Sequence, residues 1–261
     1  DRYDALWAQQ SNYRTTWQEQ ADYMFPRRAQ IILRRSKGTK QTERQYDSTA
    51  EHANSLLAAS LSGTLTSEAI QWFDVVARDE AINADQDAQE WLQIVRNQML
   101  AALNYSNFHS EVHEAYLDIG CFGTAALLCE ERPVQRAAFN GFRFTAWPCG
   151  TFVCAENGDG LVESVMRKFE LSARAVVNHP QWKASVGPKM KGIAASKEAD
   201  TPRPIIHAIY PRETKTGPDM ACASVYYDYE TKELIYEGGY DGFPVAVPRW
   251  SKAPGEVYGR G

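Results

Sequence analysis

Residues 120–133 read GCFGTAALLCEERP, and the composition of the chain changes at this stretch. Only two glycines, Gly38 and Gly63, precede Gly120, whereas eleven of the twelve prolines lie at or after Pro133. Glycine and proline interrupt helices and favour turns, so this distribution predicts helices before the boundary and strands and loops after it. We therefore expect an α+β fold in which N-terminal helices of residues 1–120 pack on a β-rich second half, residues 121–261.

Upstream of this stretch, the period of the apolar residues predicts four helices. The first covers residues 3–24 and ends before Pro26. The second begins at Ser48, which has the capping-box spacing with Glu51, and its alanines indicate close packing against another helix. The third and fourth are expected at residues 85–103 and 107–119, each with one apolar stripe.

Downstream of it, eight short β-rich runs follow, several of them separated by Asn-Gly, Asp-Gly or Gly-Gly turn signals. A short helix after Ser172 is expected to end before Pro180, and residues 183–204 are predicted to form a mobile loop. The strands are expected at residues 125–129, 142–146, 151–155, 161–170, 205–210, 221–229, 233–237 and 243–247.

The bulk composition narrows the class of protein. At 261 residues, with 44% hydrophobic and 23% charged residues, the chain resembles a soluble globular protein with one large or two small cores. Its five cysteines are odd in number and widely spaced, so we expect free thiols and a reducing compartment. No run approaches the roughly 18 apolar residues of a membrane helix. These patterns argue against membrane and secreted proteins.

Motifs of catalytic and metal sites are absent or incomplete. His109 and His113 have the i, i+4 spacing of metal ligands, but the sequence indicates no third ligand, and the carboxylate of the zinc-protease motif is misplaced. Cys149 and Cys154 could add ligands, although buried structural thiols fit their positions better. Neither a phosphate-binding P-loop nor a Gly-x-Ser-x-Gly elbow occurs. We therefore expect no catalytic residues, no metal and no cofactor, and interpret the chain as a non-enzymatic protein.

Two blocks of opposite charge follow each other along the first half. Residues 26–44 hold seven basic residues against one acid, and residues 67–90 hold seven acids against one arginine. The basic block could be a solvated loop, a contact with nucleic acid, or a contact with the acidic block of a neighbouring copy. We expect the two blocks to help set the register between copies.

Aromatic residues give a second indication of contact surfaces. Trp72-Phe73 and Trp250 stand beside polar residues, which is typical of half-buried core positions or of interface anchors. We favour the core for Phe73 and an interface for Trp72. The candidate contacts with DNA or a neighbouring subunit are Arg27, Arg28, Arg34, Arg35, Lys37, Lys40, Trp72, Arg249 and Trp250.

Several segments, in their order along the chain, resemble the head-to-tail connector (portal) proteins of short-tailed, podovirus-type bacteriophages. Each segment is weak by itself, but their common order is specific. One departure is Thr66-Ser67-Glu68, where the family has Thr-Pro-Pro, so we expect helical instead of extended backbone there. The segments are Trp17 with Pro26-Arg27, Asp47-Ser48-Thr49-Ala50, the leucine-rich run to Leu65, Trp72-Phe73, Gly123-Thr124-Ala125 with Glu130-Glu131, Gly238-Gly239-Tyr240, Phe243-Pro244, Pro248-Arg249-Trp250 and Tyr258-Gly259-Arg260-Gly261.

The resemblance implies a subunit of a ring, a dodecamer, at one capsid vertex of the virion, assembled in the host cytoplasm. Double-stranded DNA would be packaged and ejected through this ring. The implied protein partners are the terminase large subunit, the major capsid or scaffold protein and the tail adaptor protein, with no membrane. The chain would be mostly the wing region, with the stem and clip beyond Gly261. Its formal net charge of −5 suits a conduit, because a wall that does not neutralise phosphates lets a duplex slide.

Two alternatives to the portal remain open. One is another virion structural protein, such as a capsid or tail adaptor protein. The other is a cytoplasmic α+β enzyme with a helical cap, which would need a pocket where titratable groups converge. Ring formation distinguishes the portal from the enzyme.

Overall fold

A computed structural model describes residues 1–32, 38–40, 42, 44–132, 139–212 and 220–261. Helices precede the boundary stretch and strands predominate after it, which confirms the predicted α+β class. The helices are α1 (Arg2–Gln9), α2 (Ser11–Met24), the 3-10 turn η1 (Pro26–Arg28), α3 (Thr49–Leu65), α4 (Glu80–Ala84), α5 (Gln86–Asn104), α6 (Phe108–Phe122), α7 (Ala173–Val177) and α8 (Pro188–Ala194). The strands are β1 (Ala126–Glu131), β2 (Phe142–Trp147), β3 (Phe152–Glu156), β4 (Val162–Ser172), β5 (Pro202–Pro211), β6 (Cys222–Asp228), β7 (Leu234–Tyr240) and β8 (Val245–Ala246).

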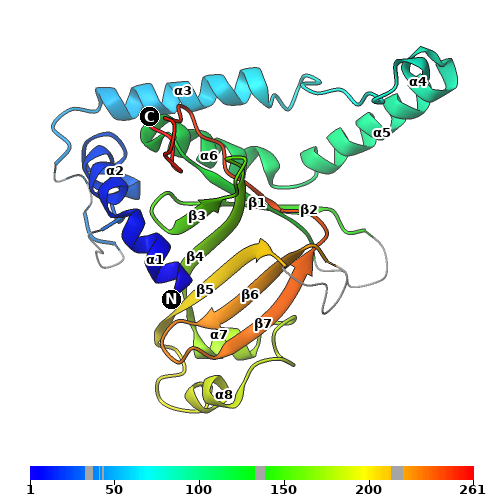
Figure 1. Cartoon of the computed structure of the whole chain (residues 1–261). Coiled ribbons are helices and arrows are strands. Elements are labelled where there is room, and N and C mark those ends of the chain that lie inside the picture. The colour runs from blue at the N-terminus through cyan, green and yellow to red at the C-terminus, as the bar shows by residue number, and fades with distance from the viewer. Residues whose placement is uncertain (33–37, 41, 43, 133–138, 213–219) are drawn as a thin grey trace.

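Two antiparallel sheets form the centre of the molecule (Figure 1). The larger has the order β3-β4-β5-β6-β7, and the smaller has the order β2-β1-β8. One face of the larger sheet packs on α1 through a cluster that includes Tyr3 and Met166. Its other face is covered at one end by the small sheet and at the other by α7 and α8, where Trp182 and Met190 are buried. Within the described residues, no helix is both long and apolar enough to cross a membrane.

The sharp end of α6 explains the boundary in the sequence. Gly123 ends this helix in the left-handed region, at φ 73°, which glycine adopts without strain. Three positions earlier, in the last turn of α6, Gly120 lies against Asn54 of α3, where a Cβ atom would overlap the amide oxygen. The close helix packing predicted for the second helix is therefore confirmed, and a glycine of α6 permits it.

The first predicted helix is wrong in one respect, because it is two helices that meet at Gln10. Gln10 is fully buried, and its Nε2 donates a hydrogen bond of 2.9 Å to the carbonyl of Phe152 in β3. The break lets the apolar residues of the two helices reach different cores. Leu6 packs against the α1 face of the larger sheet, whereas Trp17 and Ala21 enter the main core.

Three further local predictions need correction. Helix α3 begins at Thr49 as expected, but Asp47, not Ser48, accepts the capping bond from the N–H of Thr49, at 2.8 Å. The helix ends at Leu65, so residues 66–68 are not helical. Residues 183–204 are not a simple loop, because they include α8 and the start of β5. Met190 on α8 is 1% exposed, which anchors this segment to the larger sheet.

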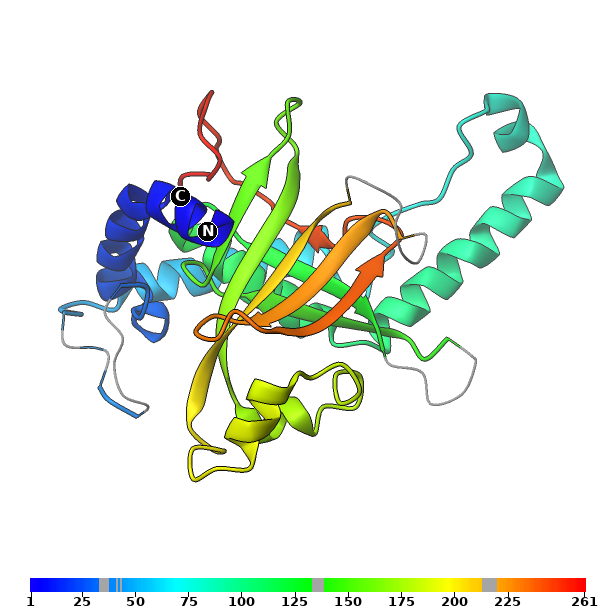
Figure 2. The same ribbon diagram turned by 60° about the horizontal axis from the view of Figure 1, so that its bottom comes forward.

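Helices α4 and α5, with the extended residues before them, project from the body as an arm, residues 67–105 (Figures 1 and 2). Helix α5 confirms the helix predicted at residues 85–103. Asp85 caps it, accepting hydrogen bonds from the N–H groups of Asp87 and Ala88 at 2.9 and 3.1 Å. Both helices of the arm are described in full, and none of their residues is buried.

Candidate functional site

The predicted contact residues Arg27 and Arg28 lie in η1, directly after α2. Both form ion pairs with Glu114 of α6, at 3.3 and 2.9 Å. Arg28 also donates from Nε to Asp118 at 3.1 Å, and its side chain is 19% exposed. These two arginines therefore neutralise acids of their own chain, and only Arg27 remains substantially open to solvent.

Asp118 is the centre of this network. It is 1% exposed, and it also accepts a hydrogen bond of 2.9 Å from the N–H of Cys149. Burial raises the pKa of Asp118 to about 6, against the lowering effect of Arg28. The network thus ties η1, α6 and the turn after β2 together around one poorly solvated carboxyl group.

The remaining basic candidates and Trp72 occupy different surroundings. Arg34, Arg35 and Lys37 lie outside the described residues, and Lys40 is exposed. Trp72 is half-buried, and its ring stacks on Phe108 with centroids 5.8 Å apart and planes 7° apart. This tryptophan therefore packs against its own chain through the ring of Phe108.

Arg249 and Trp250 are neighbours in the C-terminal segment, but Arg249 is mostly buried and Trp250 is exposed. Arg249 is 15% exposed and forms an ion pair with Glu156 at the end of β3, and Lys252 joins the same carboxylate at 2.6 Å. Trp250 donates its backbone N–H to the carbonyl of Gly123 at 2.9 Å, but the residue is 58% exposed. Of these two candidates, only Trp250 presents a large free surface.

The final Tyr-Gly-Arg-Gly string binds the segment to the body. Tyr258 is 4% exposed, packs edge-on against Trp17 with centroids 5.3 Å apart, and accepts a hydrogen bond of 3.1 Å from the N–H of Cys154. Gly259 donates its N–H to Thr124 Oγ1 at 2.8 Å, and any Cβ atom there would overlap the carbonyl oxygen of Gly123. The string is therefore required by packing.

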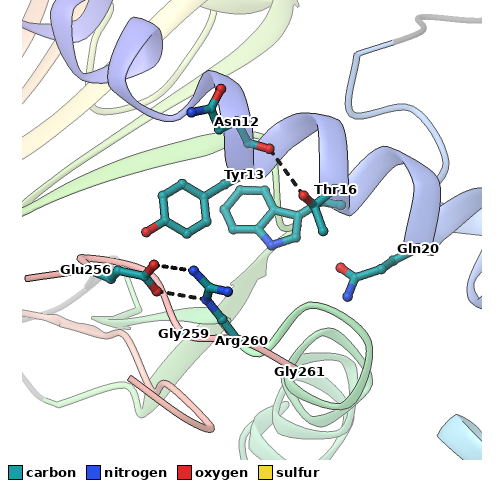
Figure 3. Close-up of a pocket in the computed structure, with 9 residues that line it drawn as sticks. Asn12, Tyr13, Thr16, Gln20, Glu256, Gly259, Arg260 and Gly261 are labelled. Carbon is teal, nitrogen blue, oxygen red and sulfur yellow. Dashed lines mark hydrogen bonds and ion pairs between the residues drawn. The ribbon is translucent and has the colours of Figure 1, made fainter. Parts of the chain in front are cut away.

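A groove of about 370 Å³ lies between α2 and this C-terminal segment (Figure 3). Asn12, Tyr13 and Gln20 line it from α2, and the ion pair of Glu256 with Arg260 lines the other side. The Nε of Arg260 donates to Glu256 at 3.0 Å. The lining combines amide, phenol and paired charged groups without a nucleophile beside a base, which suits binding more than catalysis.

A second cleft, of about 450 Å³, lies between the small sheet and the α7–α8 region. Arg167, His207 and Tyr226 stand in register on β4, β5 and β6 and line it. Within the described residues Arg167 has no acid within ion-pair distance, its Nε is buried without a hydrogen bond, and burial lowers its pKa to about 10. Nothing in the sequence singles out this arginine, because only the strand register shows that it faces the covered side of the sheet.

The histidines and cysteines singled out in the sequence do not converge. His109 Nε2 pairs with Asn104 Oδ1 at 2.9 Å, whereas His113 Nδ1 pairs with Ser62 Oγ at 3.1 Å. Over the described parts of the chain, no three His, Cys, Asp or Glu side chains are grouped for a metal ion. All five cysteines are free, as predicted, and burial raises the pKa of Cys149 and Cys154.

Comparison with known proteins gives consistent matches over the whole chain. The family model described as bacteriophage head to tail connecting protein matches residues 1–261. The chain is 26% identical over 266 residues to a probable portal protein of Bordetella phage BPP-1, covering 99% of this chain and 47% of that protein. It is 25% identical over 263 residues to a portal protein of Salmonella phage epsilon15, covering 96% and 46%. The chain spans about half the length of these curated relatives.

Proposed function

The chain belongs to the bacteriophage head-to-tail connecting protein family, and from this membership we propose that it is part of a portal subunit that forms a closed ring at one capsid vertex. The observation that carries the proposal is the match of the family model to residues 1–261, with portal proteins as its relatives. The ring is a dodecamer through which double-stranded DNA is packaged and ejected. It is assembled in the host cytoplasm and remains in the virion.

This function is mechanical. Subunits related by rotation place equivalent surfaces around an axis, and the hole that they leave guides the duplex. The terminase large subunit, the major capsid or scaffold protein and the tail adaptor protein bind the ring and supply the motor, the shell and the tail. Any response of the ring to filling is a shift between ring states, not a change in covalent bonds.

The arrangement of the candidate residues supports a structural role. Arg28 and Arg249 are held by acids of their own chain, and Tyr258 and Gly259 are held by packing. These four residues therefore stabilise the subunit itself. Among the described candidates, Trp250 and Arg27 keep exposed surface for contacts with DNA or a neighbouring subunit. Arg34, Arg35 and Lys37 lie outside the described residues and stay proposed contacts.

End-on electron-microscope averages and native mass spectrometry of the full-length protein test the proposal. A portal subunit gives closed rings with one dominant subunit number. The proposed function is contradicted if the full-length protein stays a monomer or small dimer even at high protein concentration.

A separate variant tests the basic block. Charge reversal of Arg34 and Arg35 is expected to change ring assembly or its dependence on salt, because exposed charge contacts weaken with ionic strength. If the reversed variant assembles like the wild type at all salt concentrations, the basic block has no part in the ring.

A further inference from the structure

The arm exposes a row of large apolar side chains. One face of α5 carries Trp91, Ile94 and the C-cap residue Tyr105. Ile94 follows Trp91 by three positions and Tyr105 follows Ile94 by eleven, and both spacings return to the same side of a helix. Their exposures are 62%, 50% and 87%. Val76, in the extended part of the arm, is 71% exposed. Large apolar residues exposed together on one helix face are typical of a surface that another molecule covers.

The arm has too little packing of its own to account for this surface. Its extended residues meet α5 through the ion pair of Asp74 with Arg96 at 3.2 Å, and Asn83 makes two hydrogen bonds of 2.8 Å with the backbone of Ala77. Helices in water gain most of their stability from tertiary packing of an apolar face. Helix α5 has 19 residues and none of them is buried, so its apolar face lacks the packing that would stabilise it.

The charge of the arm indicates which kind of partner covers it. Residues 67–105 contain seven acids and two arginines, a net charge of −5. The whole chain also has a net charge of −5, so the rest of the chain is neutral on balance. A strongly acidic surface repels DNA and favours a basic protein surface.

One such surface lies on the chain itself, at residues 183–197, which we call the lysine lobe. Lys183, Lys189, Lys191 and Lys197 are all exposed, and this stretch contains no acid. The ion pairs of the described residues near it use Arg174 and not these lysines. Buried Trp182 and Met190 pack the lobe against the larger sheet, so the backbone that carries the lysines is held in place.

The lysine lobe is a better receptor for the arm than the basic block of the first half. In that block Arg27 and Arg28 pair with Glu114, and Arg44 pairs with Asp22 at 2.9 Å. Those three arginines are paired within the subunit, whereas the ion pairs of the described residues include no lysine of the lobe. The one acid bound to the lobe is Glu233, which accepts hydrogen bonds from the backbone N–H groups of Lys189 and Met190 among the described residues. Beside the lobe, Leu234 is 49% exposed and offers apolar surface.

The positions of the two surfaces exclude a contact within one copy. The arm and α8 project in different directions from the body in both views (Figures 1 and 2). A closed ring requires each copy to present one surface and receive a different one. We propose that the arm of one copy binds the lysine lobe of the next copy, with Trp91 and Ile94 at the apolar centre of the contact. This inference rests on the proposed ring.

The test is a charge swap in the full-length protein. We expect Asp87→Lys with Glu90→Lys, and separately Lys189→Glu with Lys191→Glu, to raise the subunit concentration for half-assembly about tenfold at low salt, because like charges then face each other. Combining all four substitutions is expected to restore assembly. Glu19→Lys, on the exposed side of α2, is the matched control and should assemble as the wild type does.

An apolar variant gives a second measurement that does not depend on charge. Trp91→Ser should weaken assembly at all salt concentrations without changing the far-UV circular dichroism of the monomer, whereas Tyr46→Ser, at a residue 89% exposed, should do neither. If the wild type forms no ring, the proposed function fails. If it forms rings but the arm and lobe variants assemble normally, or the swap does not rescue, the function stands and this inference is overturned.

Discussion

Lowering the pH from 7 to 5 should lower the free energy of unfolding, because the folded chain keeps His207 buried and unprotonated. This residue lies in the middle of β5, is 3% exposed, and stacks on Tyr226 with ring centroids 3.9 Å apart. Its Nε2 pairs with Ser224 Oγ at 2.9 Å. Burial, assisted by the charge of Arg167, lowers the pKa of His207 to about 3 from its ordinary 6.5. His207 is therefore neutral in the folded chain over the whole range from pH 5 to pH 7.

The sign of the effect follows from which state binds the proton. Between pH 6.5 and pH 3 the unfolded chain protonates this histidine and the folded chain does not, so stability is lost as the pH falls. At pH 5 the difference from pKa 6.5 is 1.5 pH units, which at 1.36 kcal/mol per unit is a loss of about 2 kcal/mol.

Asp118 works in the opposite direction. Its pKa is about 6 in the folded chain, above the ordinary 3.8, so the folded state holds a proton that the unfolded state releases. This group therefore adds stability as the pH falls from 7 to 5, by about 1 kcal/mol. Asp118 therefore offsets part of the loss caused by His207 in the wild type.

Urea unfolding of the unassembled chain gives the free energy of unfolding at pH 7 and at pH 5. The difference between these two values isolates the contribution of each titrating group, because any effect of a substitution that does not depend on pH cancels. His207→Phe should make the chain about 2 kcal/mol less sensitive to acid, and Asp118→Asn should make it about 1 kcal/mol more sensitive. His52→Gln, on the exposed side of α3, is the control and should behave as the wild type. The reasoning is refuted if His207→Phe loses as much stability between pH 7 and pH 5 as the wild type does.

Three further predictions concern packing, buried charge and thiol reactivity. Gly259→Ala should destabilise the chain by about 2 kcal/mol in urea because its Cβ atom overlaps a backbone carbonyl, whereas Gly158→Ala, with open space around it, should have little effect. Arg167→Met should raise the free energy of unfolding by about 1 kcal/mol, because it removes a buried guanidinium that forms no ion pair with the described residues; the exposed Arg174→Met should not raise it. Cys149 should resist Ellman's reagent at pH 8 until urea unfolds the chain, since burial keeps its thiol protonated.

The parts of the fold that depend on local sequence were predictable. The third predicted helix carries its own cap at Asp85, and the fourth ends near Gly123, whose backbone conformation favours glycine. The glycine and proline distribution placed the change from helices to strands correctly. In each case the determining interaction lies within a few residues along the chain.

The parts that depend on distant contacts were not predictable. The break at Gln10 is stabilised by a hydrogen bond to Phe152, 142 residues away, and no periodicity in the first helix signals it. The pairing of Arg28 with Glu114 and Asp118 crosses 86 to 90 residues, so the sequence did not show that part of the basic block is paired within the chain. The sequence predicted one apolar stripe on the helix of residues 85–103, but the exposure of Trp91 and Ile94 appears only in the fold.

The boundary at residues 120–123 separates two kinds of secondary structure but not two cores. The main core combines Trp17 and Leu117 from the first half with Phe152, Val165 and Tyr258 from the second. Unfolding either half would expose apolar surface of the other, so the body should unfold as one cooperative unit. The arm contributes no buried residue of α4 or α5, so it can open or tighten at small cost to that core. A contact between copies through the arm could therefore adjust as a ring closes, while the body keeps its shape.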